Sequence, residues 1–272
     1  MKQFSFYLGI ITALSLGGLD HALAQGLPKT QPKIVTIVRE HVKVGRAADH
    51  SKFEAGYPAA YEKAKSPNYY LAMTSMTGPS EAWYVEPSDS HAAIGESMKR
   101  DDKDPVFSAE MNRLSLADAE YITGVETIRA LARPELSLGI FPDLAKTRFF
   151  EISTFRIRPG CDGEFSEVAK AVMAAMKRAA PKASCRVYEV LTGMPTPTFL
   201  IFSSVESYGE FDQQLLDNEA MFKGATPEER EVLKKFKEVV ERVESNHFRL
   251  DPVQSYVSKE TREKDPEFWM PK

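Results

Sequence analysis

The feature that most constrains the fold is a pattern that the chain carries twice. "IVTIVREHVKVG" begins at Ile34 and "RFFEISTFRIRPG" at Arg148, and each is an extended apolar stretch that ends in a basic residue and a Gly. A single offset of 115 residues aligns two turn motifs of the halves: Val44-Gly45 with Pro159-Gly160, and Thr77-Gly78 with Thr192-Gly193. Because two separate turns share one offset, the sequence predicts an internal repeat.

Both halves follow one order of elements. An extended stretch (34–43, 148–158) leads through Gly into a helical segment, clearest in the second half, where "CDGEFSEVAKAVMAAMKRAA" has an apolar stripe at helical spacing. Two short strands then flank the Thr-Gly turn, a charge-rich helical stretch follows to about 117 or 245, and a closing strand is expected at roughly 120–126 and 246–252. This order is β-α-β-β-α-β twice, the ferredoxin-like motif.

The expected fold class is therefore α+β, with two tandem ferredoxin-like repeats packed as an internal pseudo-dimeric α/β barrel. A single ferredoxin-like unit covers one sheet face with helices and leaves the other face bare, and two units can bury these bare faces against each other. The expected boundaries are a secretory signal at 1–24, a first repeat at 26–135, a second repeat at 145–257 and a C-terminal tail at 258–272.

The start of the second repeat resembles that of NIPSNAP-like domains, which open Tyr-Glu-Leu-Arg-Thr-Tyr and continue to a basic-Pro-Gly step and a helix. Phe150 to Phe155 match this opening in character, and Arg158-Pro159-Gly160 match it closely, whereas Ser153 departs from the family's Arg. The first repeat keeps only Val42 to Gly45, without the Pro. The resemblance implies the dimeric α/β-barrel superfamily, which includes cofactor-independent monooxygenases, haem enzymes and isomerases, and it does not choose among them.

The first 24 residues predict export. Lys2 precedes an apolar run from Phe4 to about Leu16, and "ALA" precedes Gln25, which is the arrangement of a cleaved secretory signal. The run is shorter than the ~20 residues of a membrane span. We therefore expect a periplasmic or extracellular protein that is not membrane-bound after cleavage. With a net charge of −4 and no basic block, the chain offers no electrostatic footprint for nucleic acid.

Alternation along the first strand of each repeat suggests catalytic candidates. Val35, Ile37, Arg39 and His41 share one face, and Arg156 aligns with His41 in the second repeat. On both strands this face is apolar at its start and polar at its end, as expected for a cavity that opens to solvent or for a strand that reaches the surface. Here His41 or Glu189 would act as a base and Arg156 would stabilise an oxyanion. The opposite face, suited to packing under helices, also contains Glu40 and Glu151, which do not fit that assignment.

Aromatic residues on the predicted second and third strands suggest an apolar binding wall, although such residues are also ordinary core residues. The ligand-binding candidates, with one histidine of a closing strand, are Tyr70, Trp83, Tyr84, Tyr188 and His247. His50 and His91 are expected on solvated helix faces.

The sequence predicts neither a metal site nor a cofactor, because it has no HExxH or CxxC motif and no Gly-rich phosphate loop. Haem would require His41 or His247 as its axial ligand. Cys161 and Cys185 flank a helix of about 27 Å, at 1.5 Å per residue, so no disulfide is expected between them.

The leading functional hypothesis is an exported protein that binds a small, largely apolar organic molecule between its two sheets. One alternative is a cofactor-independent enzyme of the monooxygenase or isomerase type, which requires polar side chains that converge on an open cavity. The other is a non-catalytic structural or interaction protein with a packed interior. The sequence leaves further oligomerisation and the identity of the ligand open.

Overall fold

The structure, a computed structural model, describes residues 26–271; the predicted signal at 1–24 lies outside the described residues. Eight strands of the described part form one closed antiparallel barrel in the order β1-β3-β2-β8-β5-β7-β6-β4. The strands are β1 Ile34–Val42, β2 Tyr70–Ser75, β3 Glu81–Ser88, β4 Ile122–Ala132, β5 Phe149–Ile157, β6 Arg186–Thr192, β7 Thr198–Val205 and β8 Val240–Tyr256. An eight-stranded barrel of this size is just wide enough for side chains to fill it.

Two seams join the first four strands to the last four. β2 pairs with the C-terminal part of β8, and β4 pairs with β6. β8 is 17 residues long because its N-terminal part also pairs with β5 along that strand's whole length. A single strand therefore belongs to the sheets of both halves.

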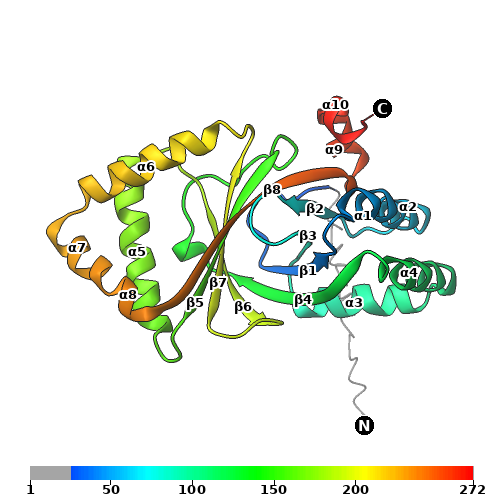
Figure 1. Cartoon of the computed structure of the whole chain (residues 1–272), viewed down its shortest axis with the longest axis horizontal. Coiled ribbons are helices and arrows are strands. Elements are labelled where there is room, and N and C mark those ends of the chain that lie inside the picture. Colours follow the sequence, from blue (N-terminus) through cyan, green and yellow to red (C-terminus); the bar gives the residue numbers. More distant parts are fainter. Residues whose placement is uncertain (1–25, 272) are drawn as a thin grey trace, which may run out of the picture.

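Helices cover the barrel on two opposite sides (Figure 1). The helices of the first half are α1 Ala47–Glu54, α2 Gly56–Lys63, α3 His91–Asp102 and α4 Pro105–Asp118; those of the second half are α5 Asp162–Ala179, α6 Glu210–Gly224, α7 Pro227–Lys234 and α8 Phe236–Val239. Several begin at residues suited to a helix start: Asp104 accepts from the backbone N–H groups of Val106 and Phe107, and Thr226 forms a capping box with Glu229. Among residues 26–271, no helix has both the length and the apolar character that a bilayer span requires.

Side chains that point into the barrel form its core. Val35 and Ile37 of β1 face inward, as the strand alternation predicts, and pack with Trp83, Phe150 and Phe248. On the outer face of the second half, Ile157, Phe165 and Phe199 form a separate cluster beneath α5. The predicted assignment of the two faces of β1 and β5 is thus confirmed for their apolar residues.

One predicted helix is shorter than expected. The sequence pattern extends a helix to about residue 245, whereas α8 ends at Val239 and residues 240–245 are strand. Val240 is buried, and the segment pairs with β5, with one register shift between Arg156 and Ile157. Pairing with β5 therefore outweighs the helical preference of the charged residues in this stretch.

The tail packs against the body. It contains α9 Lys259–Lys264 and α10 Pro266–Trp269, and the buried Trp269 donates from Nε1 to the carbonyl of Ala145 over 3.0 Å. The tail therefore wraps against the body. Cys161 caps the start of α5, Cys185 follows the end of that helix, and both thiols are free.

Candidate functional site

A cavity of about 370 Å³ lies between the outer face of the first-half sheet and the helices that cover it. This volume falls within the range of small-molecule pockets, which starts at about 300 Å³. We call it the helix-side cavity. Its lining residues come from β1 to β4 and from α1, α2 and α4. Asn112, Ser115 and Val125 are exposed lining residues, so the cavity reaches solvent between α4 and β4.

The helix α1 has an unusual buried face. Its two buried residues are His50 and Glu54, which are one helical turn apart and therefore lie on the same face. His50 is 1% exposed and Glu54 is 2% exposed. The expectation that His50 lies on a solvated helix face is wrong, whereas His91 is exposed at the start of α3.

These two residues meet carboxylates from two other elements. Glu40 of β1 and Asp118 at the end of α4 are also buried. We call Glu40, His50, Glu54 and Asp118 the carboxylate–histidine cluster; one donor atom from each lies within 4.8 Å of all the others. His50 Nε2 is 3.0 Å from Glu40 Oε2 and 3.6 Å from Asp118 Oδ1. The three carboxyl residues line the helix-side cavity, and His50 is not among its lining residues.

The cluster has an excess of negative charge for a buried site. Within residues 26–271, no Lys or Arg forms an ion pair with any of its three carboxyl groups. Burial, together with the neighbouring Glu40, raises the pKa of Glu54 to about 9, and the same causes raise the pKa of Asp118 to about 6. At neutral pH, Glu54 therefore keeps a proton while Glu40 has the His50 ring as its partner.

Two of the carboxyl oxygens make no hydrogen bond, although the His50 ring lies 3.6 Å from one of them, Asp118 Oδ1. Glu54 Oε1 and Asp118 Oδ1 are buried and accept no hydrogen bond, although each residue is only 2% exposed. Buried polar atoms are almost always satisfied, so such exceptions ask for an explanation. Both residues line the helix-side cavity.

Tyrosines form the remainder of the wall. Tyr57 and Tyr61 of α2, Tyr70 of β2 and Tyr84 of β3 all line the helix-side cavity. Burial raises the pKa of each of these phenols, so they stay protonated. The Tyr84 hydroxyl donates to Gln254 Oε1 over 2.9 Å. Such a wall offers aromatic surface together with hydroxyl groups.

A second polar group lies on the same wall. Glu86, two residues beyond Tyr84 on the same face of β3, accepts a hydrogen bond from Asn68 Nδ2 over 2.9 Å. Burial raises the pKa of Glu86 as well. The cavity thus has acidic groups at two positions along its sheet face.

The three residues predicted to be catalytic are held in separate ion pairs. His41 lies 3.3 Å from Glu81 and 3.6 Å from Glu126. Arg156 pairs with Glu241 at 3.1 Å, and Glu189 pairs with Arg133. None of the three lines the helix-side cavity. The structure does not bring them together.

The predicted ligand-binding residues are divided among several places. Tyr70 and Tyr84 line the helix-side cavity. Trp83 lies in the barrel core and donates from Nε1 to Glu81 Oε2 over 2.9 Å. His247 is stacked on Phe211 at 4.1 Å and bonded to the Tyr208 hydroxyl. Tyr188 lines a different cavity, at one end of the barrel.

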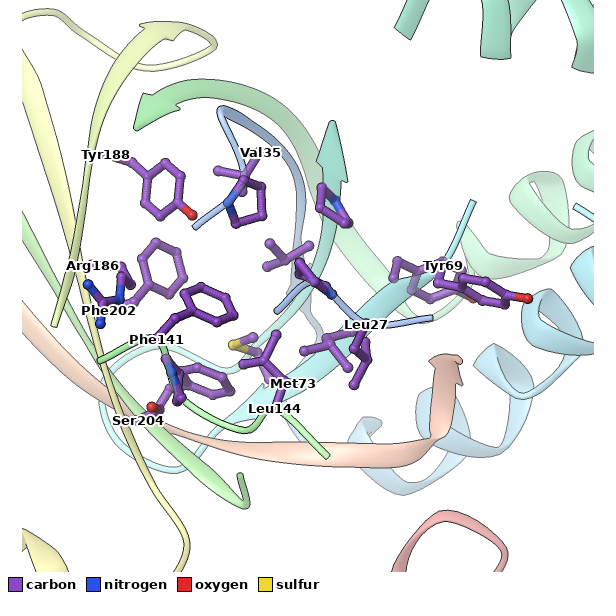
Figure 2. A pocket seen from close by; sticks show the side chains of 18 of the residues that line it. Leu27, Val35, Tyr69, Met73, Phe141, Leu144, Arg186, Tyr188, Phe202 and Ser204 are labelled. Carbon is purple, nitrogen blue, oxygen red and sulfur yellow. The ribbon is translucent and has the colours of Figure 1, made fainter. Parts of the chain in front are cut away.

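This barrel-mouth cavity is the space that remains between the two sheets. Figure 2 shows Val35, Tyr188, Phe202 and Met73 around it, with Leu27 and Phe141 from outside the barrel strands. Its lining is almost wholly apolar, but its volume is only about 80 Å³. An apolar cavity that binds benzene measures about 150 Å³. A ligand of that size would require movement of the segments around Leu27 and Phe141.

The sequence contained a signal for the cluster that was not recognised. Glu40 is a charged residue on a strand face suited to packing under helices, and this mismatch marks the site. Asp118 ends the buried stripe of α4 that begins with Phe107 and Leu114. The spacing of four between His50 and Glu54 was a further signal. The sequence alone could not predict that α1, α4 and β1 pack against one another.

Comparison with known proteins shows the fold. No protein-family model matches the chain, and no curated protein sequence is significantly similar to it. Solved structures that resemble it include an anthrone oxidase-like protein, with a TM-score of 0.55 and 11% identity over 83% of this chain and 94% of the other.

Two further structures are candidate monooxygenases. The one from Fusobacterium nucleatum has a TM-score of 0.53 and 11% identity, over 80% of this chain and 91% of that chain. The one from Lactobacillus acidophilus has a TM-score of 0.51 and 9% identity, over 84% and 99%. The chain thus has the dimeric α/β-barrel fold of these proteins.

Proposed function

We propose that this protein is an enzyme that acts on a small organic molecule in the helix-side cavity, with chemistry of the oxygenase or isomerase type. The observation that supports it best is the carboxylate–histidine cluster, which is buried, has unsatisfied oxygens and opens onto a cavity of substrate size. Titratable groups perturbed in this way gather at functional sites.

The side chains of the cluster suit proton transfer. Glu40 is assigned as the acceptor, because it lies in the cavity wall and its Oε2 is 3.0 Å from Nε2 of the buried His50 ring. Glu54, with its pKa near 9, is the donor at neutral pH. Two carboxyl groups whose environments separate their acidities can remove a proton at one atom and return it at another. The same removal leaves an electron-rich carbon that molecular oxygen can attack.

The walls favour an aromatic substrate that carries a hydroxyl or carbonyl group. Four tyrosines provide ring surface and hydrogen-bond donors along the cavity. The names of the similar structures, a candidate monooxygenase and an anthrone oxidase-like protein, lend weight to oxygenation. At 9–11% identity they support this choice only as analogy.

Oxygen uptake with anthrone as the probe tests the proposal. Oxidation consumes one O₂ per anthrone and yields anthraquinone and water, so an oxygen electrode and anthraquinone absorbance must agree. Glu54→Gln is expected to lower turnover by at least about 100-fold, because a positioned acid or base contributes that much.

Glu189→Gln is the matched control, since Glu189 pairs with Arg133 and does not line this cavity. It should leave turnover within about twofold of the wild type. Equal losses in both variants, or turnover that survives Glu54→Gln, would count against the helix-side cavity as the active site.

A second proposal keeps the leading sequence hypothesis, an apolar molecule bound between the sheets. The observation in its favour is the apolar lining of the barrel-mouth cavity. Its small volume makes it the weaker proposal. A co-purifying apolar compound, detected by mass spectrometry of the native protein and lost in Val35→Trp, would favour it.

We further propose that the halves arose by duplication of one ferredoxin-like unit and that the chain is exported. The shared offset of 115 supports the duplication, since Gly45 and Gly160 both have positive φ, as do Gly78 and Gly193. The export proposal rests on the predicted signal at 1–24. N-terminal sequencing of the protein recovered from the periplasm or medium of the host tests the signal.

A further inference from the structure

We propose that the carboxylate–histidine cluster binds one divalent first-row transition cation, such as Mn²⁺, Fe²⁺ or Zn²⁺. The inference rests on the proposed function and refines it: an ion at this site would take the place of the Glu54 proton, so the acid and base roles given above describe the metal-free site. It is independent of any sequence motif, since the donors come from β1, α1 and α4.

The spacing of the donor atoms fits a single ion. The four donors lie within 4.8 Å of one another. Around an ion with ligand distances of about 2.1 Å, adjacent ligands are about 3 Å apart and opposite ligands about 4.2 Å apart. The His50 Nε2 atom already lies 3.0 Å from Glu40 Oε2 and 3.6 Å from Asp118 Oδ1. The limit of 4.8 Å is about 0.6 Å wider than the distance between opposite ligands, so the donors would draw together around an ion.

The unsatisfied atoms point to the same conclusion. Glu54 Oε1 and Asp118 Oδ1 belong to side chains that are 98% buried by exposed area, and neither accepts a hydrogen bond. Leaving such oxygens without a partner costs about 1–3 kcal/mol each. A cation held between them would satisfy both, and it would also supply the positive charge that no Lys or Arg of the described residues provides.

The donor types select the kind of cation. One imidazole nitrogen and three carboxylate oxygens form a mixed set, softer than the all-oxygen sites of Mg²⁺ and Ca²⁺ and harder than thiolate sites. The helix-side cavity adjoins three of the four donors, so a substrate oxygen or water can reach an open position on the ion. An ion there would polarise an oxygen atom of the bound molecule.

Metal titration of the purified protein tests the inference. The protein is freed of metal with EDTA, dialysed, and titrated with MnCl₂ while the EPR signal of free Mn²⁺ is followed; ZnCl₂ is titrated by calorimetry. We expect one ion per chain. His50→Ala and Glu54→Gln should each weaken binding by at least about tenfold, in keeping with the loss of a ligand.

His91→Ala is the matched control, because His91 is an exposed helix residue. It should bind the ion as the wild type does. Glu54→Gln is expected to keep the fold, because Gln has the shape of the neutral Glu side chain in the metal-free site. Circular dichroism checks the fold of this variant. Absence of stoichiometric binding, or equal binding by all three variants, would overturn the inference.

Oxygen uptake, measured with and without added Mn²⁺, separates this inference from the proposed function. If turnover survives EDTA treatment and the protein binds no ion, the proposed cation is overturned and the proposed active site stands. If the wild type binds one ion per chain, His50→Ala loses that binding and no turnover is detected, the cation is supported and the result counts against the oxygenase function.

Discussion

The sheets of the two halves carry different residues beneath their helices at positions 115 apart. Glu40 and Tyr84 face the helix-side cavity in the first half, whereas Phe155 and Phe199 occupy the matching positions in the second. On the first helix after the strand, His50 and Glu54 correspond to Phe165 and Ala169. Four polar positions on one side of the barrel are thus apolar on the other.

The two interfaces differ accordingly. In the second half, Phe165 packs on Phe199 with ring centroids 4.6 Å apart, and Phe155 lies 6.0 Å from Phe236. Such rings fill the interface and stabilise it. In the first half, the same region holds a cavity and charged groups that cost stability. The comparison shows that one half packs aromatic rings beneath its helices where the other half has a polar cavity.

The most severe test of this difference transfers the first-half residues into the second half. The double variant Phe155→Glu, Phe165→His loses two packed rings and buries polar groups in an apolar cluster. It should be destabilised by more than about 4 kcal/mol. Urea denaturation followed by circular dichroism measures this, and a loss below about 1 kcal/mol would show that the second-half core is not what stabilises the barrel.

Removal of the imidazole from the first half should have the next largest effect. His50→Ala leaves the buried Glu40 without its 3.0 Å partner. We expect a loss of about 3 kcal/mol in the metal-free protein, as for other broken buried pairs. His91→Ala should change the free energy of unfolding by less than about 0.5 kcal/mol. Similar denaturation midpoints for the two variants would show that the contact between Glu40 and His50 does not stabilise the fold.

Tyr84→Phe makes the first half resemble the second at one position. It removes the hydroxyl that donates to Gln254 Oε1, and Gln254 is fully buried. The expected cost is about 1 kcal/mol, because an amide oxygen is left without that donor. Thermal unfolding monitored by fluorescence measures it, and a stabilised variant would mean that the hydroxyl is not needed to satisfy Gln254.

The smallest effect should come from Glu86→Gln, and it should depend on pH. Burial raises the pKa of Glu86 in the folded protein above its value of about 4.5 in the unfolded chain. The Glu86 side chain therefore contributes fully to stability below about pH 4.5, and this contribution is lost as the pH rises through the folded-state pKa. A Gln side chain does not titrate, so the variant does not lose stability in this way. The free energy of unfolding of the variant should therefore rise relative to that of the wild type as pH increases, by less than about 1 kcal/mol at neutral pH. Glu96→Gln, on an exposed helix face, is the control.

Strand alternation and the offset of the two Thr-Gly turns predicted most of the architecture. They placed Val35 and Ile37 inside the barrel and Phe155 and Ile157 under helices, as the structure has them. The end of α8 was misplaced, because pairing with β5 is a long-range effect that local pattern does not contain.

The candidate site was harder to predict than the fold. Tyr70 and Tyr84 line the helix-side cavity rather than the space between the sheets, and their role as ligand-binding residues stays a prediction. The carboxylate–histidine cluster depends on how α1 and α4 close over β1. Residues 40, 54 and 118 become neighbours only through that packing, and no spacing in the sequence encodes it.

The strand shared by both halves also has a consequence for synthesis of the chain. β2 pairs with residues 248–256, so one edge of the first-half sheet stays open until nearly the whole chain has left the ribosome. The other edge, on β4, waits for residues 188–192. Open strand edges invite pairing with other chains. A nascent or truncated chain that ends near residue 135 should therefore aggregate rather than fold as an independent domain.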